Sequence, residues 1–348
     1  MSEKDKIRAG NYIGFGVLIM LTLILFVGAI SLGSVDITLK EVFNSIFGRA
    51  TDSVSSIIVK EIRLPMAITA ALSGASLSVA GLILQTVFRN PLAGPSLLGV
   101  SSGASLGVAL LMMGGIYSVN FSLLPSGSWM IVMGAAIIGA LSVIALLLGF
   151  SSLVRNGVML LIIGVMISYL ASSIISLLSF SASGSSLKAF TIWGLGSFSD
   201  VTMSQIILFS ACCLVLLILS FGCIKSLNAF LLGERYASSL GYNVKSIRAL
   251  LLLLSGLLTA VITSYCGPIG FIGLIVPHII RLLFGTSNHF IVLPGSILGG
   301  ASVSLLCVIL ANGYFTENPL PINVVTPLIG VPVIIYIILR GNKMPYFK

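Results

Sequence analysis

Long apolar runs recur along the whole chain and constrain its fold more than any other feature. Ten such runs are separated by short polar segments, and they cover residues 12–32, 64–86, 95–113, 129–149, 157–178, 203–223, 247–266, 268–284, 291–311 and 322–339. A run of roughly 20 mostly apolar residues can cross the hydrocarbon core of a bilayer as a helix. Charged residues make up only 8% of the chain, against about 25% in soluble domains. We therefore expect an all-α integral membrane protein with about ten transmembrane helices.

The net charge of +9 is divided unevenly between the two sides of the membrane. If the N-terminus lies in the cytoplasm, thirteen Lys and Arg side chains fall in cytoplasmic segments and five fall outside. This bias follows the positive-inside rule and places both termini in the cytoplasm. The basic composition therefore has a topological cause and does not predict nucleic-acid binding. The first run is too long for a signal peptide, so we expect it to be retained.

Two segments between the runs have helical patterns of their own. In residues 36–48 the apolar side chains follow a helical period, and Thr38 and Glu41 have the spacing of a capping box. We expect an amphipathic helix on the outer membrane surface. In the loop 224–247, Leu232, Tyr236 and Leu240 share one helical face. The pattern fits a cytoplasmic docking surface and an interfacial connector equally well.

Repeated motifs and clustered prolines indicate a transporter. Leu72-Ser73-Gly74 recurs 182 residues later as Leu254-Ser255-Gly256, on runs that cross in opposite directions, which indicates a weak inverted repeat. Prolines at 91 and 95, and glycines and prolines between 267 and 277, predict broken helices. Broken helices persist at membrane depth only where they are buried in protein or line a cavity.

The sequence lacks the usual means of driving transport by itself. All nine acidic residues fall in the tail or in loops, whereas ion-coupled carriers usually keep a carboxylate in the membrane. A nucleotide-binding P-loop is absent. We expect no catalytic residues, metal site or cofactor, and a structural role for His278. A transporter body driven by a separate motor fits best, and the alternatives are an ion-gradient-driven secondary carrier and a membrane scaffold.

Several motifs, in the same order along the chain, resemble a known family. They are Arg63-Leu64-Pro65, Asn90-Pro91-Leu92-Ala93 with Pro95, Gly233-Glu234 through Leu240-Gly241, and Gly273-Leu274-Ile275-Val276-Pro277-His278. The chain is similar, from about residue 30 to its end, to the membrane permeases of type II ABC importers. These importers take up ferric siderophores, haem or vitamin B12, and the sequence does not choose among these substrates.

The resemblance implies partners and a role for named residues. It implies one permease domain over 1–348 in the bacterial cytoplasmic (inner) membrane, which is not an enzyme itself. The permease would pair with a second copy, two cytoplasmic ABC ATPases and an extracytoplasmic substrate-binding protein. For ATPase coupling, the resemblance implies Leu232, Gly233, Glu234, Ala237, Leu240 and Gly241. For the cytoplasmic gate and path, it implies Asn90, Pro91, Leu92, Gly157 and Val158. For docking of the binding protein, it implies Arg63 and Lys60.

The sequence departs from the family pattern at the docking face. Family members commonly carry a second arginine where this chain has Met66, and another where it has Asn312. Exposed ion pairs at the rim of an interface act mainly on association rate and its salt dependence. We therefore expect docking here to depend less on salt than in typical relatives.

Overall fold

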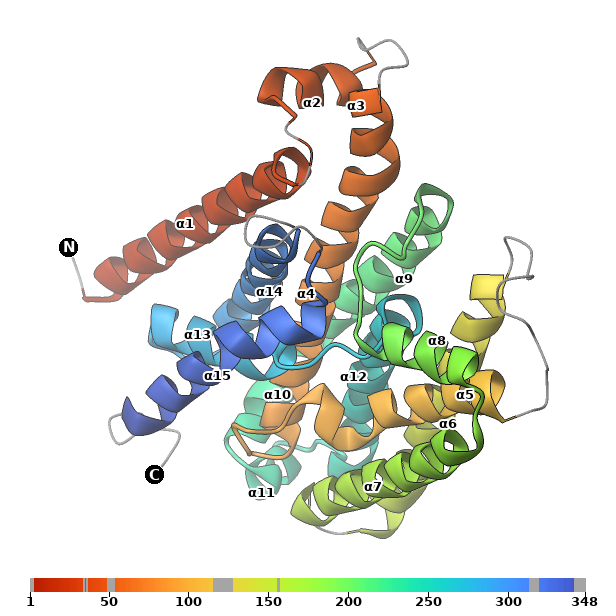
Figure 1. Ribbon diagram of the computed structural model, residues 1–348. Coiled ribbons are helices and arrows are strands. Elements are labelled where there is room, and N and C mark those ends of the chain that lie inside the picture. The colour runs from red at the N-terminus through yellow and green to blue at the C-terminus, as the bar shows by residue number, and fades with distance from the viewer. Residues whose placement is uncertain are drawn as a thin grey trace.

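The computed structural model describes residues 3–33, 35, 37–48, 54–114, 128–154, 157–312 and 319–340, and every regular element within them is helical (Figure 1). The first half contains α1 (Glu3–Ser31), α2 (Leu39–Ile46), α3 (Val54–Ile57), the π-helical segment η1 (Ile58–Arg63), α4 (Leu64–Val87), the 3-10 turn η2 (Pro95–Leu98), α5 (Val100–Met113), α6 (Ser128–Leu153) and α7 (Gly157–Ser181). The second half contains α8 (Gly184–Gly194), α9 (Met203–Gly222), α10 (Ile224–Leu231), α11 (Glu234–Ser239), α12 (Val244–Cys266), α13 (Ile272–Phe284), α14 (His289–Ala311) and α15 (Ile322–Arg340).

The predicted runs correspond to helices of two lengths. In the part of the chain that the structure describes, seven helices are long and apolar enough to cross a membrane. Three shorter apolar helices, α5, α13 and α15, occupy the remaining predicted runs. The prediction of about ten apolar helices is therefore confirmed, and the chain is a multi-pass membrane protein. Of the cations in the charge comparison, Arg49, Arg155, Lys343 and Lys348 lie outside the described residues.

The short helices result from the predicted breaks. The run 95–113 divides at Gly99, whose φ of 77° ends η2 and leaves α5 with 14 residues, or about 21 Å of helix. Phe271 has a φ of 69° immediately before α13, a conformation that non-glycine residues rarely adopt. The predicted broken helices are confirmed at both places.

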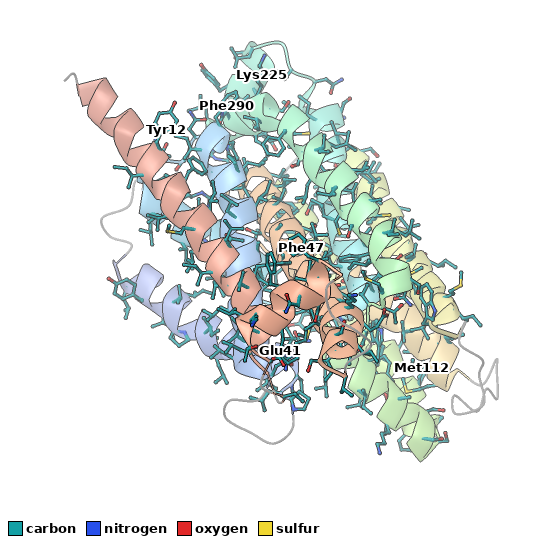
Figure 2. All side chains as sticks on the ribbon, turned by 90° about the horizontal axis from the view of Figure 1, so that it is seen from above. Tyr12, Glu41, Phe47, Met112, Lys225 and Phe290 are labelled. Atoms are coloured by element: carbon teal, nitrogen blue, oxygen red, sulfur yellow. The ribbon has the colours of Figure 1, made fainter. Side chains whose placement is uncertain are left out.

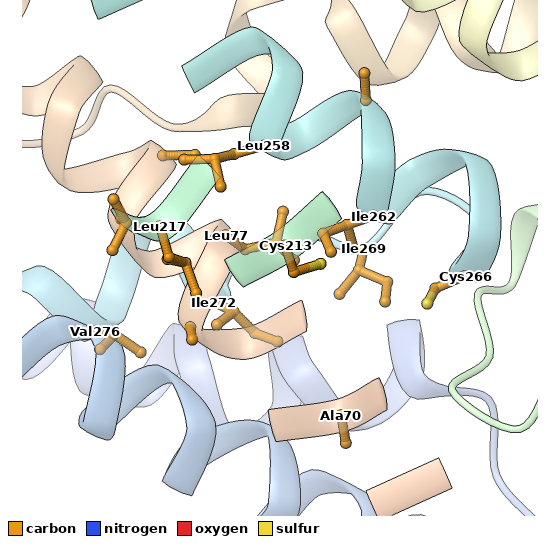
Figure 3. Packing of buried hydrophobic residues seen from close by; sticks show 14 of the residues in the cluster. Ala70, Leu77, Cys213, Leu217, Leu258, Ile262, Cys266, Ile269, Ile272 and Val276 are labelled. Carbon is orange, nitrogen blue, oxygen red and sulfur yellow. The ribbon is translucent and has the colours of Figure 1, made fainter. Parts of the chain in front are cut away.

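Helix α4 forms the centre of the bundle and contacts α9, α12, α13 and α14 (Figure 1). Twenty of its 24 residues are buried. Figure 3 shows Leu77 of α4 packed among Cys213 and Leu217 of α9 and Leu258 of α12. Lipid chains are as apolar as these side chains, so association within the membrane depends on close packing and on small residues.

The helices that carry the two repeated motifs run antiparallel. Ser73 near the start of α4 lies 3.6 Å from Cys266 at the end of α12, measured between Oγ and Sγ. Further along α4, the carbonyl oxygen of Ala80 accepts a hydrogen bond of 3.1 Å from Ser255 Oγ. Opposite directions are what the predicted inverted repeat requires.

Gly81 allows α4 and α13 to touch along their backbones. A Cβ atom at this position would lie 1.7 Å from the carbonyl oxygen of Gly273. Overpacking a core costs about 1–3 kcal/mol, and here the obstacle is backbone, which cannot rotate away. We expect Gly81→Ala to lower the melting temperature of the purified protein by at least about 3 °C. The control is Gly134→Ala, because nothing lies within 4 Å of a Cβ there. Equal melting temperatures for the two variants would contradict this packing.

The amphipathic helix predicted within 36–48 is confirmed as α2. Its cap is reciprocal: Glu41 N donates to Thr38 Oγ1 at 3.3 Å, and Thr38 N donates to Glu41 Oε2 at 2.8 Å. The bonds that Thr38 donates to Glu41 Oε2, from its backbone amide and from its hydroxyl, hold the pKa of the Glu41 carboxyl below its ordinary value. Val42 is buried against the bundle, whereas Phe43 and Phe47 are exposed with ring centroids 4.4 Å apart. The helix therefore presents a pair of aromatic rings on its outward face.

Candidate coupling and gating site

The bundle has two ends, which we name after helices α2 and α11. Figure 2 shows Glu41 and Met112 near one end and Lys225 and Phe290 near the other. Helix α4 runs from Leu64 at the α2 end, directly after Arg63 of η1, to Val87 at the α11 end. The residues predicted for the gate and for coupling lie at the α11 end, and those predicted for docking lie at the α2 end.

The Asn90-Pro91-Leu92 loop begins where α4 ends in a Schellman motif. Arg89 N donates to Thr86 O at 3.3 Å, and Asn90 N donates to Gln85 O at 3.2 Å. Arg89 occupies the left-handed position of this motif with a φ of 47°. The Asn90 side chain then closes a turn, because its Oδ1 accepts a hydrogen bond of 2.9 Å from Leu92 N. As a result the Leu92 side chain is exposed at the tip of the loop.

Helix α13 is connected to this loop and to the end of α4 through His278 and Arg281 of α13 and Gln85 of α4. His278 Nε2 donates to the carbonyl oxygen of Pro91 at 2.6 Å, which fits the expected structural role. Gln85 Nε2 donates to Leu274 O at 3.0 Å, while Gln85 Oε1 accepts from Arg281 Nη1 at 2.6 Å. The second predicted gate segment lies alongside: a Cβ at Gly157 would be 3.5 Å from Val87 O, and Val158 next to it is exposed. The two predicted gate segments therefore meet at the end of α4.

The predicted coupling loop folds into α10 and α11, which present one buried and one exposed face. Ala237 is fully buried against Ala229 and Phe230. The exposed fractions of Leu232, Tyr236 and Leu240 are 62%, 48% and 56%, so all three are apolar surface residues in or next to α11, and we call them together the α11 stripe.

Two glycines make the sharp turns on either side of α11. Gly233 and Gly241 have φ values of 114° and 84°, which favour glycine. Gly241 N donates to Ser238 O at 2.9 Å, and Tyr242 N donates to Ala237 O at 3.1 Å, so α11 also ends in a Schellman motif. The geometry thus explains why glycine occurs at both ends of the motif.

Helix α11 is joined to the bundle by a salt bridge and a close contact. The carboxylate of Glu234 pairs with the guanidinium of Arg248, whose exposed fraction is 3%. Arg248 Nη1 also donates to Val154 O at the end of α6, at 3.4 Å. On the other side of α11, a Cβ at Gly233 would lie 3.6 Å from Arg89 Nη1. Gly233, one of the predicted coupling residues, therefore lies close to Arg89, the neighbour in sequence of the predicted gate residue Asn90.

Sequence reasoning missed a second connection between α10 and α4. His289 is fully buried at the start of α14, with Nε2 2.8 Å from Thr86 Oγ1. Its Nδ1 donates to Asn228 Oδ1 at 2.8 Å, and Asn228 belongs to α10. The available signal was that His289, one of only two histidines, begins an apolar run, where polar side chains usually have a partner. Nothing in the sequence indicates Asn228 as that partner.

The docking residues predicted at the α2 end differ in accessibility. Arg63 has an exposed fraction of 5%, and its guanidinium donates to the carbonyl oxygens of Ile30 at 3.1 Å, Ser31 at 2.7 Å and Val35. The bonds to Ile30 and Ser31 satisfy carbonyl groups that the end of α1 leaves without helical partners. Lys60 is half-buried, one turn earlier in η1. Arg63 is therefore enclosed by its own chain, and its docking role stays a prediction.

Met66 and Asn312, the two positions where the family pattern predicts arginine, are also in contact. Met66 Sδ lies 3.1 Å from Asn312 Nδ2 and 3.2 Å from Ser199 Oγ, both of which can donate to it. Together with Arg63 these three residues line a cavity of about 380 Å³. The cavity beside Arg63 is thus lined by an uncharged amide and a thioether.

Comparisons with known proteins agree on one family. The model of the FecCD transport family matches residues 21–340. The hemin transport system permease HmuU of Yersinia pestis is 34% identical over 94% of this chain and 96% of its own. The vitamin B12 import system permease BtuC of Klebsiella pneumoniae is 35% identical over 85% of this chain and 86% of its own. The molybdate import system permease MolB of Haemophilus influenzae is 33% identical over 94% and 97%.

A solved structure has the same fold. It is described as an inward-facing conformation of a metal-chelate type ABC transporter, and it matches with a TM-score of 0.82 at 29% identity. The match covers 94% of this chain and 99% of that one. The similarity therefore extends over nearly the whole length of both molecules.

Proposed function

The chain belongs to the FecCD transport family and is the permease subunit of an ABC importer, and from this premise we propose how it transports and what it carries. The substrate is a metal chelate: an iron siderophore, haem or vitamin B12. Relatives named for hemin and vitamin B12 import, and the similarity to a metal-chelate type transporter, support this class. The secondary-carrier reading is set aside, because no family of ion-coupled carriers is among the matches described above.

We place the partners at the two ends of the bundle. Two cytoplasmic ATPases bind a homodimer of the permease, each on one α11 stripe, because these apolar side chains are exposed while Ala237 of the same helix packs against α10. A substrate-binding protein docks at the α2 end. This arrangement puts both termini in the cytoplasm and the protein in the bacterial cytoplasmic membrane, as the charge bias predicts.

The proximity of Gly233 to Arg89 is the observation that carries this mechanism. ATP binding can shift the permease between two arrangements only through different affinity for each of them. A displacement of α11 reaches the Asn90-Pro91-Leu92 loop through Arg89, and reaches Thr86 through Asn228 and His289. The substrate itself undergoes no chemistry, since the permease only changes the side from which the path is open.

Reconstituted transport tests the proposed function. Proteoliposomes containing the permease, its ATPase and its binding protein should take up substrate only with ATP, and a Walker mutation in the ATPase should abolish uptake. Native mass spectrometry of the binding protein, purified with its cargo, identifies the substrate. Uptake driven by an ion gradient without the ATPase would disprove the importer mechanism.

Asn90→Ala tests the gate. The substitution removes one side-chain hydrogen bond at the loop, worth about 1 kcal/mol, so the protein should still fold. We expect a changed leak or uptake rate at unchanged expression. The control is Asn243→Ala at the same end, because Asn243 Oδ1 also accepts from a backbone amide, Ser246 N at 3.2 Å. If both variants transport alike, Asn90 has no special role in the path.

A further inference from the structure

A second pocket at the α2 end contains both tryptophans of the chain. The pocket has a volume of about 270 Å³, and its walls include Trp129 of α6, Trp193 of α8 and Tyr265 of α12. The sequence has no other tryptophan. Tryptophan and tyrosine often anchor membrane proteins at the headgroup level, where they face lipid. Here three aromatic side chains line one concave site instead.

The same pocket includes a carboxylate. Asp200 lies in the loop between α8 and α9 and lines the pocket with the aromatic residues. The residue is accessible to solvent, but partial burial of its carboxyl group raises the pKa, and the hydroxyl of Ser197 opposes this shift by donating a hydrogen bond. No Lys or Arg among the described residues forms an ion pair with Asp200. The subunit therefore leaves this acid available to an external cation.

A carboxylate beside aromatic faces is a binding site for an organic cation. Ammonium and guanidinium groups are attracted to the faces of Trp and Tyr, and guanidinium also stacks on them. The volume is slightly smaller than that of most small-molecule sites, which is about 300–1,000 Å³. It therefore suits the end of one side chain better than a whole metal chelate.

The pocket is linked to the predicted docking face by two adjacent residues, Ser199 and Asp200. Ser199, next to Asp200 in the chain, lies in the cavity of Arg63 and contacts Met66. At Met66 and Asn312 this chain lacks the cationic groups that would meet an acidic partner. Asp200, an exposed acid in an aromatic pocket, instead gives this face a negative charge that can meet a basic partner.

We propose that the Asp200 pocket binds a Lys or Arg side chain of the substrate-binding protein. The proposal rests on the proposed function, because it assumes a protein that docks at the α2 end. Arginine and aromatic residues are enriched among the side chains that dominate interface affinity, and they act from well-packed pockets like this one. The pocket then provides an anchoring contact with the charges reversed relative to the usual arrangement in the family.

Because both tryptophans line the pocket, intrinsic fluorescence reports directly on binding. The full-length permease, purified in detergent, is titrated with N-acetyl-arginine amide and, as a neutral isostere, with N-acetyl-citrulline amide. We expect a saturable change in fluorescence with the arginine compound and none with the citrulline compound. Asp200→Asn should weaken arginine binding roughly fivefold to thirtyfold, which corresponds to about 1–2 kcal/mol. Equal responses to both compounds, or an unchanged affinity in Asp200→Asn, would overturn the proposal.

Two further variants keep the result interpretable. If Asp200→Asn does not fold, Trp193→Leu serves instead, and undiminished arginine affinity in that variant would equally overturn the proposal. In Trp129→Phe the remaining tryptophan is Trp193, so a fluorescence change on arginine binding in that variant comes from Trp193. Failure of the transport mechanism would appear separately, as absent ATP-dependent uptake in proteoliposomes, because the fluorescence titration involves neither ATPase nor substrate.

Discussion

Leu240→Arg is expected to abolish ATP-dependent uptake while the permease still folds and inserts. The side chain is 56% exposed at the end of α11 and forms part of the α11 stripe, so the fold does not need it. In the complex, however, the substitution would bury a charge without a partner. Losing a central interface contact costs about 2 kcal/mol or more, or roughly thirtyfold in ATPase affinity. Co-purification of the ATPase and uptake in proteoliposomes are the measurements.

Ser238→Arg provides the matched control for this experiment. Ser238 is exposed on the same helix, two residues after Tyr236 and therefore on the opposite side from the α11 stripe. It should keep the ATPase and most of the uptake, although it adds the same charge. If Leu240→Arg also keeps both, the α11 stripe is an interfacial connector and the coupling assignment is wrong.

The apolar runs predicted most of the fold because each helix carries its own signal. Length and composition alone indicate a membrane-crossing helix. The capping box of α2 is recognisable from two residues three positions apart, Thr38 and Glu41. The prolines and glycines likewise indicated the breaks before α5 and α13, although not which residue adopts the left-handed conformation. That Phe271 rather than a neighbouring glycine has a positive φ depends on how α13 packs.

The contacts within the candidate site could not be predicted in the same way. The motif around Asn90 is local, but its support comes from His278 and Arg281, nearly 200 residues later in the chain. The direction of the Arg63 side chain could not be predicted either. A long cation at the start of a crossing can point outward to a partner or inward to free carbonyl groups. The choice was decided by where α1 ends, some 30 residues earlier, and the sequence holds no local sign of that position.

Arg63→Ala is accordingly expected to lower stability strongly, and salt dependence of docking only weakly. Removing the guanidinium leaves the carbonyl groups of Ile30, Ser31 and Val35 without this donor, at about 1–3 kcal/mol for each group that stays buried and unsatisfied. We expect a melting temperature several degrees lower, measured on the purified protein. Arg63→Lys should restore little of it, since an ammonium cannot reproduce the forked geometry of a guanidinium.

Lys60→Ala should have the opposite effects, with little change in stability and a clear change in the salt dependence of docking. The side chain is half-buried in η1 at the same end, so its loss should leave the melting temperature nearly unchanged and reduce the salt dependence of binding-protein affinity. With neutral Met66 and Asn312 beside Arg63, few charges remain to produce a salt effect even in the unmodified permease. Binding-protein affinity for the reconstituted transporter, measured over a salt series for the three proteins, decides the matter. A steep salt slope that survives in both Arg63→Ala and Lys60→Ala would mean that docking depends on other charged groups, of which Asp200 is one, since exposed pairs beyond about 10 Å are screened at 0.1 M salt and cannot act from a distance.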